Sequence, residues 1–320
     1  GEAYRKAEIS YQKHVINLKG VHEYILEEPN VYLLDMAKFA FDGKGAGTEE
    51  EILRIDALCG EYIGMQDREN MPQPWVQEDM DSGHSLTLWF QIKSEMEYEG
   101  ALLAAEDTEK QEFYWNGMLI KPEIKGYFAD KCIQTFALPA IHKGVNLLKV
   151  KRNLTTRTRV ERLYILGKFG VRLEGEEQTI VPRREKIGYA PLPMQNMPFY
   201  SGNISYVHEI VTPECDLMVE TSHYRGAAVK IYLDGEECGY TALAPYRIMI
   251  PKVTEGIHIL ECKLLGNRFN SFGPLHNTVK SQTWHGPEEW RTTGNGWSYE
   301  YQVEDLGILS APKVTILTRE

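Results

Sequence analysis

Short stretches of alternating apolar and polar residues dominate the chain from about residue 84 onward. Ser85–Ile92, Gly202–Ile210 and Val229–Leu233 each alternate in this way, and Gly, Pro, Asn and Asp lie between such stretches. A period of two predicts a strand with one buried face, on which Trp89 would point into the core. Many short strands separated by turn residues are typical of β-sandwiches. The pattern therefore predicts a mainly β fold.

The first 80 residues have a different pattern. Val21–Leu26 and Val31–Leu34 predict short strands, with Pro29 and Asn30 as the turn between them. Glu49–Tyr62 carries apolar residues at helical spacing and predicts a helix with Thr48 as its N-cap. We therefore expect residues 1–80 to form a separate small unit of mixed α/β or β structure.

Comparison of the chain with itself indicates an internal repeat. Three segments of the middle part match three segments of the C-terminal part in the same order: Phe113–Gly117 with Ile231–Gly235, Phe136–Lys151 with Ile248–Lys263, and Val160–Leu166 with Val303–Leu309. Both members of the first match end in Asn-Gly or Asp-Gly, which is the strongest short signal for a β-hairpin. The third match requires an insertion between Lys263 and Val303. We interpret the repeat as a duplicated sheet module.

The repeat and the turn-rich segments predict the domain boundaries. We expect a first jelly-roll β-sandwich at 81–175, a linker rich in Glu and Pro at 176–198, and a second jelly-roll β-sandwich at 199–320. The second module carries a long aromatic loop at 264–302.

Composition excludes several partners. The net charge of −11 argues against nucleic acid, which requires clustered Lys and Arg. No apolar run is long enough to span a membrane, and no signal segment opens the chain. Five irregularly spaced cysteines predict neither a disulfide framework nor a zinc site, and we expect Cys132, Cys238 and Cys262 to be buried thiols. Free thiols favour a reducing compartment and a cytoplasmic location.

The order of these motifs resembles a known family. A strand ending in Asn-Gly or Asp-Gly, an apolar residue before Pro, and a Gly-led alternating strand resemble the galactose-binding-like jelly roll. Such modules are sugar-binding domains of large bacterial glycoside hydrolases of the β-galactosidase, β-mannosidase and α-rhamnosidase types. The second copy carries the closer resemblance, in Gly202–Tyr206, Ala244–Tyr246, Asn270–His276, Trp297–Tyr299 and Leu306–Ile308.

The resemblance implies an accessory region. The catalytic part of these hydrolases is normally a (β/α)₈ barrel with two carboxylates at strand ends, and this chain lacks the strand–helix alternation of such a barrel. Because the chain has no initiator Met, we also expect it to be a piece of something longer. The expected partners are therefore a carbohydrate and a catalytic domain elsewhere in the same polypeptide.

The sequence contains no recognisable set of catalytic residues. The chain has no Gly-x-Ser-x-Gly elbow and no His-x-x-x-His pair on a predicted helix, and we expect neither a metal nor a cofactor. Glu161 and Glu304 occupy the same repeat position, which favours a shared structural role over catalysis.

The aromatic loop supplies the main binding candidates. Aromatic planes stack on sugar rings, while sugar hydroxyls need amide, imidazole or carboxylate partners. The candidates of this kind in the loop are Trp284, Trp290, His276, His285, Asn277 and Arg291. The alternative is that these aromatics anchor a long loop against its own sandwich or a neighbouring domain. Trp297, next to a returning strand, is expected in the core.

A second candidate lies in the first copy. Trp115 and Asn116 are predicted at a hairpin tip, where a large aromatic side chain has little core to enter. Two alternative roles remain for Trp115 and Asn116, namely carbohydrate binding and packing between domains.

Three functions fit the sequence. The first is a non-catalytic region that binds carbohydrate or organises the domains of a bacterial glycoside hydrolase. The second is a structural scaffold between domains that binds no sugar. The third is a glycoside hydrolase with an unfamiliar active site, which requires a cleft with two carboxylates roughly 5–10 Å apart. Solvent exposure of Trp284 and Trp290 distinguishes the first from the second.

Overall fold

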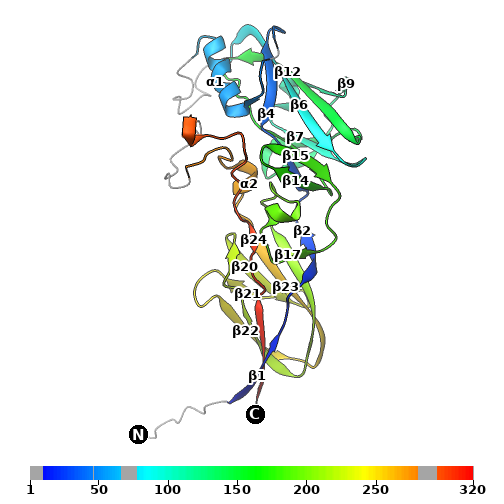
Figure 1. Ribbon diagram of the computed structural model, residues 1–320, viewed down its shortest axis with the longest axis vertical. Coiled ribbons are helices and arrows are strands. Elements are labelled where there is room, and N and C mark those ends of the chain that lie inside the picture. The colour runs from blue at the N-terminus through cyan, green and yellow to red at the C-terminus, as the bar shows by residue number, and fades with distance from the viewer. Residues whose placement is uncertain (1–9, 46, 66–77, 280–293, 320) are drawn as a thin grey trace.

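The computed structural model describes residues 10–45, 47–65, 78–279 and 294–319. In this part of the chain two β-sandwiches lie one above the other along the long axis (Figure 1). Two separate clusters of buried apolar side chains correspond to the two sandwiches. The prediction of a mainly β fold built from sandwiches is confirmed.

The first sandwich pairs a five-stranded sheet with a larger one. The five-stranded sheet has the order β10 (Ile124–Phe128), β11 (Asp130–Ala137), β7 (Leu102–Ala105), β13 (Leu163–Gly167) and β3 (Asn30–Leu34). The larger sheet has the order β14 (Gly170–Glu174), β15 (Glu177–Val181), β6 (Asp81–Ser94), β12 (Gly144–Thr155), β8 (Gln111–Trp115) and β9 (Met118–Ile120). β4 (Met36–Phe41) joins this sheet through β6 and also pairs with β5 (Glu50–Glu51).

The second sandwich has a four-stranded and a six-stranded sheet. The smaller sheet has the order β1 (Tyr11–Ile16), β25 (Lys313–Arg319), β18 (Cys215–Glu220) and β22 (Arg247–Val253). The larger has the order β16 (Ile187–Gly188), β2 (Val21–Leu26), β17 (Ile204–Thr212), β23 (Gly256–Leu265), β20 (Ala228–Leu233) and β21 (Glu236–Thr241). β19 (Tyr224–Arg225) and β24 (Gly307–Ile308) form a small ribbon beside them.

The strand orders of the two sandwiches correspond. The order β11–β7–β13–β3 in the first matches β22–β18–β25–β1 in the second, and β6–β12–β8–β9 matches β17–β23–β20–β21. Two of the three sequence matches agree with this correspondence. The third does not, because Val303–Leu309 contains β24, whereas the strand in the position of β13 is β25.

The first 80 residues supply strands to both sandwiches. β1 pairs with the C-terminal strand β25 along its whole length, and β2 pairs with β17. β3 and β4 pair with β13 and β6 of the first sandwich. The first sandwich is therefore inserted into the chain of the second, between β2 and β16. The described strands of this segment do not form the expected separate unit, because their backbone groups pair with strands far along the chain.

The segment expected to be a linker is also partly sheet. β15 begins at Glu177 and pairs with β14 and, in parallel, with β6. β16 and then η4 (Leu192–Gln195) follow it and lead into the second sandwich.

The helix prediction is confirmed, with a different cap. α1 (Ile52–Tyr62) buries Ile52, Ile55 and Cys59, and its N-cap is Glu51 instead of Thr48. The Glu51 carboxylate accepts a hydrogen bond from the backbone N–H of Leu53, which satisfies one of the free donors of the first turn.

Two burial predictions need correction. In β6 the core face carries Leu86, Leu88, Phe90 and Ile92, so Trp89 lies on the opposite face and is only half-buried. Cys262 is buried and Cys238 half-buried, but Cys132 is exposed in β11. All five thiols are free.

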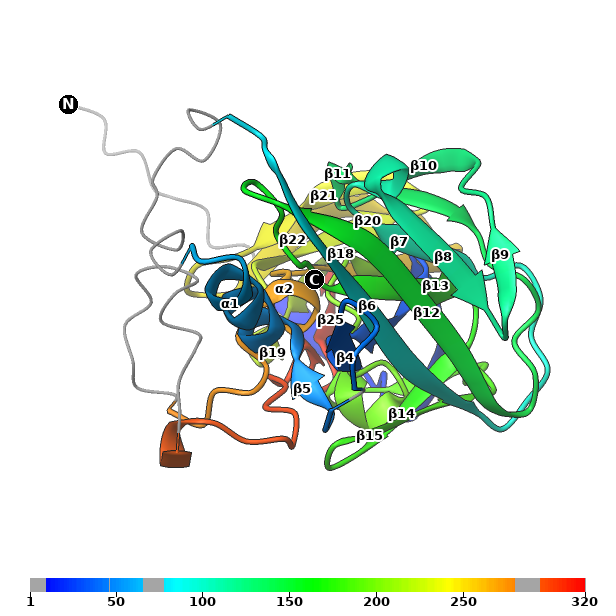
Figure 2. The same ribbon diagram turned by 90° about the horizontal axis from the view of Figure 1, so that it is seen from above.

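The C-terminal loop returns to the first sandwich. Figures 1 and 2 both show the orange-to-red segment that includes η6 (Gly294–Gly296) on the same flank as α1. Leu275 and Tyr301 belong to the buried cluster of the first sandwich, although the strands on either side of the loop belong to the second. No helix in the described part of the chain is long and apolar enough to cross a membrane.

Candidate functional site

The predicted carbohydrate site is only partly described. Trp284, His285, Trp290 and Arg291 lie at 280–293, outside the described residues. His276 and Asn277 precede this segment, and Trp297 to Tyr301 follow it. Asn277 forms a single antiparallel bridge with Trp297, so the two ends of the loop lie together.

His276 faces inward and contacts Asp35 of the first sandwich. Its Nδ1 donates to the Ser298 carbonyl at 2.8 Å, and its Nε2 lies 3.3 Å from Asp35 Oδ2. Asp35 is fully buried and follows β3 directly. The Tyr301 hydroxyl donates to the other Asp35 oxygen at 2.6 Å. A carboxylate and an imidazole thus face each other in a site closed to water.

Electrostatics favour the charged form of both groups. Burial opposes the His276 imidazolium, but the hydrogen bond to Asp35 and its charge outweigh burial and raise the pKa of His276. Burial likewise opposes the Asp35 carboxylate, and the hydrogen bond and charge of His276 lower its pKa below the usual value. When His276 is protonated, the two side chains form a buried ion pair that joins the C-terminal loop to the end of β3.

Neighbouring polar groups complete the network. Gln178 of β15 donates through Nε2 to the Tyr301 hydroxyl at 2.7 Å and to the Leu33 carbonyl at 2.9 Å. Arg162 lies 3.6 Å from Glu51 and donates to the Gly273 carbonyl at 2.8 Å. We call this buried cluster the loop-docking cluster; it consists of His276, Asp35, Tyr301, Gln178, Arg162 and Glu51. It holds the C-terminal loop against β5, β15, the end of β3 and the start of β13.

Aromatic stacking extends the contact to α1. The Trp297 ring lies 5.3 Å from the His276 ring at an interplanar angle of 27°, and the Arg54 guanidinium lies 4.0 Å from its centroid. Trp297 is half-buried, which agrees only in part with the expected core position. The Tyr299 ring meets the edge of Trp297 at 4.6 Å. These contacts orient Tyr299, which is 47% exposed.

A groove lies beside Tyr299 on the surface of the first sandwich. Its volume is about 250 Å³. Its walls come from β3, β6, β15 and the C-terminal loop, and the polar and aromatic members are Tyr32, Glu49, Gln91, Lys93, Glu176, Glu177, Gln178, Tyr299 and Tyr301. Lys93 and Glu177 form an ion pair at 2.7 Å. The groove therefore combines an exposed aromatic ring with amide, ammonium and carboxylate groups, which are the groups that bind sugar hydroxyls and ring faces.

Trp115 and Asn116 lie elsewhere and have structural roles. Trp115 is 1% exposed in the first core, and its indole N–H donates to the Ala140 carbonyl at 3.0 Å. Asn116 accepts from the Leu147 N–H at 2.8 Å and donates to Asn146 at 3.1 Å. The expectation that a hairpin tip leaves Trp115 outside the core is wrong, because the alternation of β8 turns its last side chain inward. This pair presents no aromatic surface to a ligand.

Two further observations concern the acidic side chains of the described part. The carboxylates of the loop-docking cluster, Asp35 and Glu51, are buried and face the cations His276 and Arg162. Among the described residues no group of three or more His, Cys, Asp or Glu side chains is arranged to hold a metal ion.

Sequence reasoning identified His276 and the loop but missed Asp35, Gln178 and Tyr299. His276 and Asp35 are separated by 241 positions, so no local motif joins them. The available signal was the polar Asp35 at the end of an apolar run, Val31–Leu34, where a buried carboxylate requires a partner.

Comparison with known proteins gives no family. No family model and no curated protein matches this chain. Among solved structures, a rhamnosidase from Novosphingobium sp. PP1Y has a TM-score of 0.31 and 15% identity, over 87% of this chain and 25% of that one. A GH2 β-galacturonidase from Eisenbergiella tayi has a TM-score of 0.25 and 20% identity, over 46% and 22%. A β-D-mannosidase from Dictyoglomus thermophilum has a TM-score of 0.26 and 12% identity, over 74% and 31%.

The chain thus spans about a third or less of the length of these structures. At such TM-scores and identities the similarity assigns neither a family nor an activity to this chain.

Proposed function

We propose that this chain is a non-catalytic carbohydrate-binding region of a bacterial glycoside hydrolase, and that the groove beside Tyr299 binds the sugar. The observation that carries the proposal is an exposed tyrosine ring, in edge contact with Trp297, at the rim of a polar groove. The catalytic domain of the same polypeptide is the proposed neighbour, as the resemblance of the sequence motifs implies.

The groove has the physical properties that a weak carbohydrate site requires. A sugar presents an apolar C–H face and several hydroxyl groups, so it needs one aromatic plane and several polar partners. Tyr299 offers the plane, and Gln91, Glu176 and Lys93 offer acceptors and donors. At about 250 Å³ the groove admits one sugar ring or one end of a longer glycan.

Glycan-array screening, followed by calorimetric titration of the strongest glycan, tests this proposal. We expect Tyr299→Ala to weaken binding about tenfold, because the loss of one aromatic stacking contact costs roughly 1 kcal/mol or more. Tyr240→Ala is the matched control, since Tyr240 is exposed on β21 of the other sandwich. Trp284→Ala tests the part of the predicted site outside the described residues. If the wild type binds no glycan, or if Tyr299→Ala binds as tightly as the wild type, the groove is not the site.

The loop-docking cluster favours a second candidate function, a scaffold that fixes domains without binding sugar. His276 and Tyr301 are buried against Asp35, so these aromatic residues of the loop already act as anchors. On this alternative the chain binds no glycan, and variants of the cluster change only stability. A glycan array combined with urea unfolding of the same variants therefore separates the two functions.

A further inference from the structure

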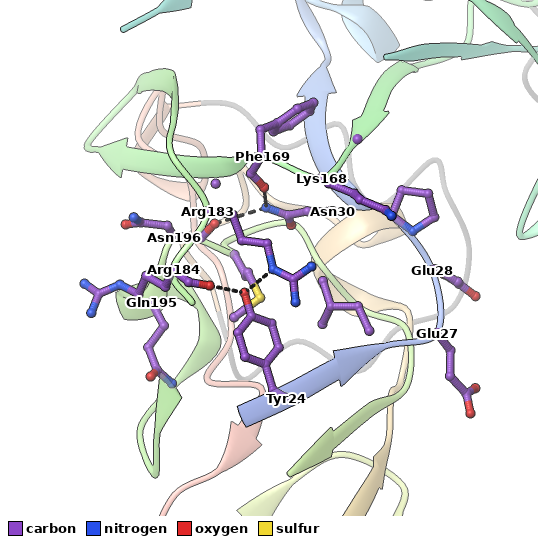
Figure 3. Close-up of a pocket in the computed structure, with 15 residues that line it drawn as sticks. Tyr24, Glu27, Glu28, Asn30, Lys168, Phe169, Arg183, Arg184, Gln195 and Asn196 are labelled. Carbon is purple, nitrogen blue, oxygen red and sulfur yellow. Dashed lines mark hydrogen bonds between the residues drawn. The ribbon is translucent and has the colours of Figure 1, made fainter. Parts of the chain in front are cut away.

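A second cavity lies where the two sandwiches meet. Its volume is about 240 Å³. Its walls come from the end of β2 and the turn into β3, the turn between β13 and β14, the segment after β15 and the segment after η4 (Figure 3). The cavity is therefore built by both sandwiches and lies outside the Tyr299 groove.

Arg183 is positioned to present its guanidinium to this cavity. Its Nε donates to the Tyr24 hydroxyl at 2.7 Å, and its Cζ lies 4.5 Å from the centroid of the Tyr24 ring. The Tyr24 hydroxyl in turn donates to the Arg184 carbonyl at 2.7 Å. Figure 3 shows the end of the Arg183 side chain turned toward the middle of the lining residues, whereas the Arg184 side chain points away. The terminal nitrogens of Arg183 have no protein partner among the described residues.

Lys168 supplies a second cation without a counter-charge. It lies in the turn between β13 and β14, where its backbone N–H donates to the Tyr98 hydroxyl at 2.7 Å. Its ammonium group forms no ion pair with a described residue. Because the turn is fixed by that bond, the base of the Lys168 side chain is held at the rim of the cavity.

The two acidic residues of the lining are neutralised from outside. Glu27 pairs with Lys263 at 2.8 Å, and the hydrogen bond to Lys263 lowers its pKa. Both carboxylate oxygens of Glu28 accept hydrogen bonds from Arg268. Figure 3 shows both carboxylates pointing outward. The cavity therefore has a net positive charge, in a chain whose overall charge is −11.

The remaining walls are apolar or rigid. Leu26, Pro29 and Met197 contribute apolar surface. Asn30 is buried and donates to the carbonyls of Phe169 and Asn196, at 2.9 and 3.1 Å, which ties the two turns together. The amide orientation follows from these two acceptors, since only the Nδ2 group can donate to carbonyl oxygens.

We infer that this cavity binds a single sugar ring that carries a carboxylate, a uronate. The carboxylate would lie between Arg183 and Lys168, since guanidinium and ammonium groups form charge-assisted hydrogen bonds with carboxylates. The C–H face of the ring would lie on the apolar wall. Free phosphate would use the cations and leave the apolar wall unused, and a neutral sugar would leave both cations unpaired. The volume is below the roughly 300–1,000 Å³ of pockets for drug-sized ligands, which fits one ring.

Titration calorimetry of the chain with glucuronate, galacturonate, glucose, galactose and inorganic phosphate tests this inference. We expect one or both uronates to bind and the neutral sugars to bind at least about tenfold more weakly, because the charged hydrogen bonds are lost. Binding should weaken as the NaCl concentration rises. If phosphate binds as tightly as the uronates, the cavity is a plain anion site, and the uronate assignment is overturned.

Variants locate the site. Lys168→Met and Arg183→Met should each weaken uronate binding about tenfold. Lys186→Met removes the same charge from an exposed position that does not line the cavity, and it should bind like the wild type. Arg183 also contacts Tyr24, so its variant is checked by thermal unfolding. The exposed Lys168 keeps the test decisive if Arg183→Met is unstable. Unchanged uronate binding by Lys168→Met would refute the site.

Uronate binding in this cavity is independent of the proposed function of the groove. Tyr299→Ala should leave uronate binding unchanged, because Tyr299 does not line this cavity. Glycan binding that depends on Tyr299 without uronate binding here would overturn only this inference. Uronate binding that depends on Lys168 without glycan binding at Tyr299 would overturn only the groove.

Discussion

Replacement of Asp35 by asparagine removes the charge of the buried ion pair with little change in shape. In the wild type the carboxylate accepts the Tyr301 hydroxyl at 2.6 Å and faces the His276 Nε2 at 3.3 Å. In the Asp35→Asn variant the new side-chain carbonyl would still accept from Tyr301, but an amide would then face an imidazolium. Loss of one partner from a buried ion pair costs about 3–5 kcal/mol. Since asparagine keeps one hydrogen bond, we expect a loss of about 3 kcal/mol in the free energy of unfolding at pH 5.5.

The loss should depend on pH. The pKa of His276 is raised in the wild type, so the stability that it contributes is present below its unfolded pKa and disappears as the pH rises through the folded value. The pKa of Asp35 is lowered, so its contribution is present above its unfolded pKa and disappears as the pH falls through the folded value. In Asp35→Asn the buried imidazole should lose its proton at a lower pH than in the wild type, and the neutral ring can then accept a hydrogen bond from the new amide. The difference between variant and wild type should therefore shrink toward pH 8.5.

Urea unfolding at pH 5.5, 7 and 8.5, followed by circular dichroism, measures this difference. Two sandwiches with separate cores can unfold in separate steps, so the transition of the first sandwich is the relevant one. Asp305→Asn is the control, because Asp305 is exposed and its substitution should change stability by no more than about 0.5 kcal/mol. Equal losses at all three pH values, or a loss no larger than in the control, would refute the account of a charged His276–Asp35 pair.

Three further predictions concern other parts of the chain. Burial, with the charge of His22, lowers the pKa of His208 from 6.5 to about 4. The contribution of His208 to the free energy of unfolding is therefore complete above pH 6.5 and falls as the pH drops toward 4. His208→Asn should flatten this part of the curve of stability against pH. Gly266→Ala should cost about 3 kcal/mol in urea unfolding, because the new Cβ would lie 1.9 Å from the Ser201 carbonyl oxygen, whereas Gly47→Ala, with open space around it, should cost little. Trp115→Ala should lower the stability of the first sandwich by about 3–5 kcal/mol and leave glycan binding intact, and weaker glycan binding by the folded variant would contradict its assignment to the core.

Local features of the fold were predicted well. Asn116-Gly117 and Asp234-Gly235 both form the expected tight turns, with positive φ at all four residues, between β8 and β9 and between β20 and β21. Gly144 and Gly256 begin the long strands β12 and β23, also with positive φ. These features depend on only a few neighbouring residues, so their chemistry can be read from the sequence.

Features that depend on distant partners were predicted poorly. The short strands of the first 80 residues were recognised, but their partners were not, because the backbone groups of a strand can pair with any other strand. The third repeat match failed for a related reason. Val303–Leu309 resembles β13 in its apolar residues, but in the second sandwich β25 occupies the position that corresponds to β13.

The candidate sites also fall into those that the sequence indicated and those that only the folded chain shows. The aromatic loop and His276 were identified from composition, because three tryptophans in one inserted segment are conspicuous. The Tyr299 groove and the cavity between the two sandwiches were not, because their walls come from segments that are far apart along the chain. A cation such as Arg183 has no special sequence context, and it becomes a binding candidate only where the fold leaves it without a counter-charge.

Side-chain periodicity and backbone preference within a few residues were enough to specify many of the strands, the hairpin turns, the helix α1 and the sandwich class. Three features required the folded chain: the insertion of the first sandwich into the second, the docking of the C-terminal loop on Asp35, and the charges that remain unpaired. These features arise from burial and electrostatic pairing between distant residues. Their free energies depend on positions in space, and such positions exist only once the chain has folded.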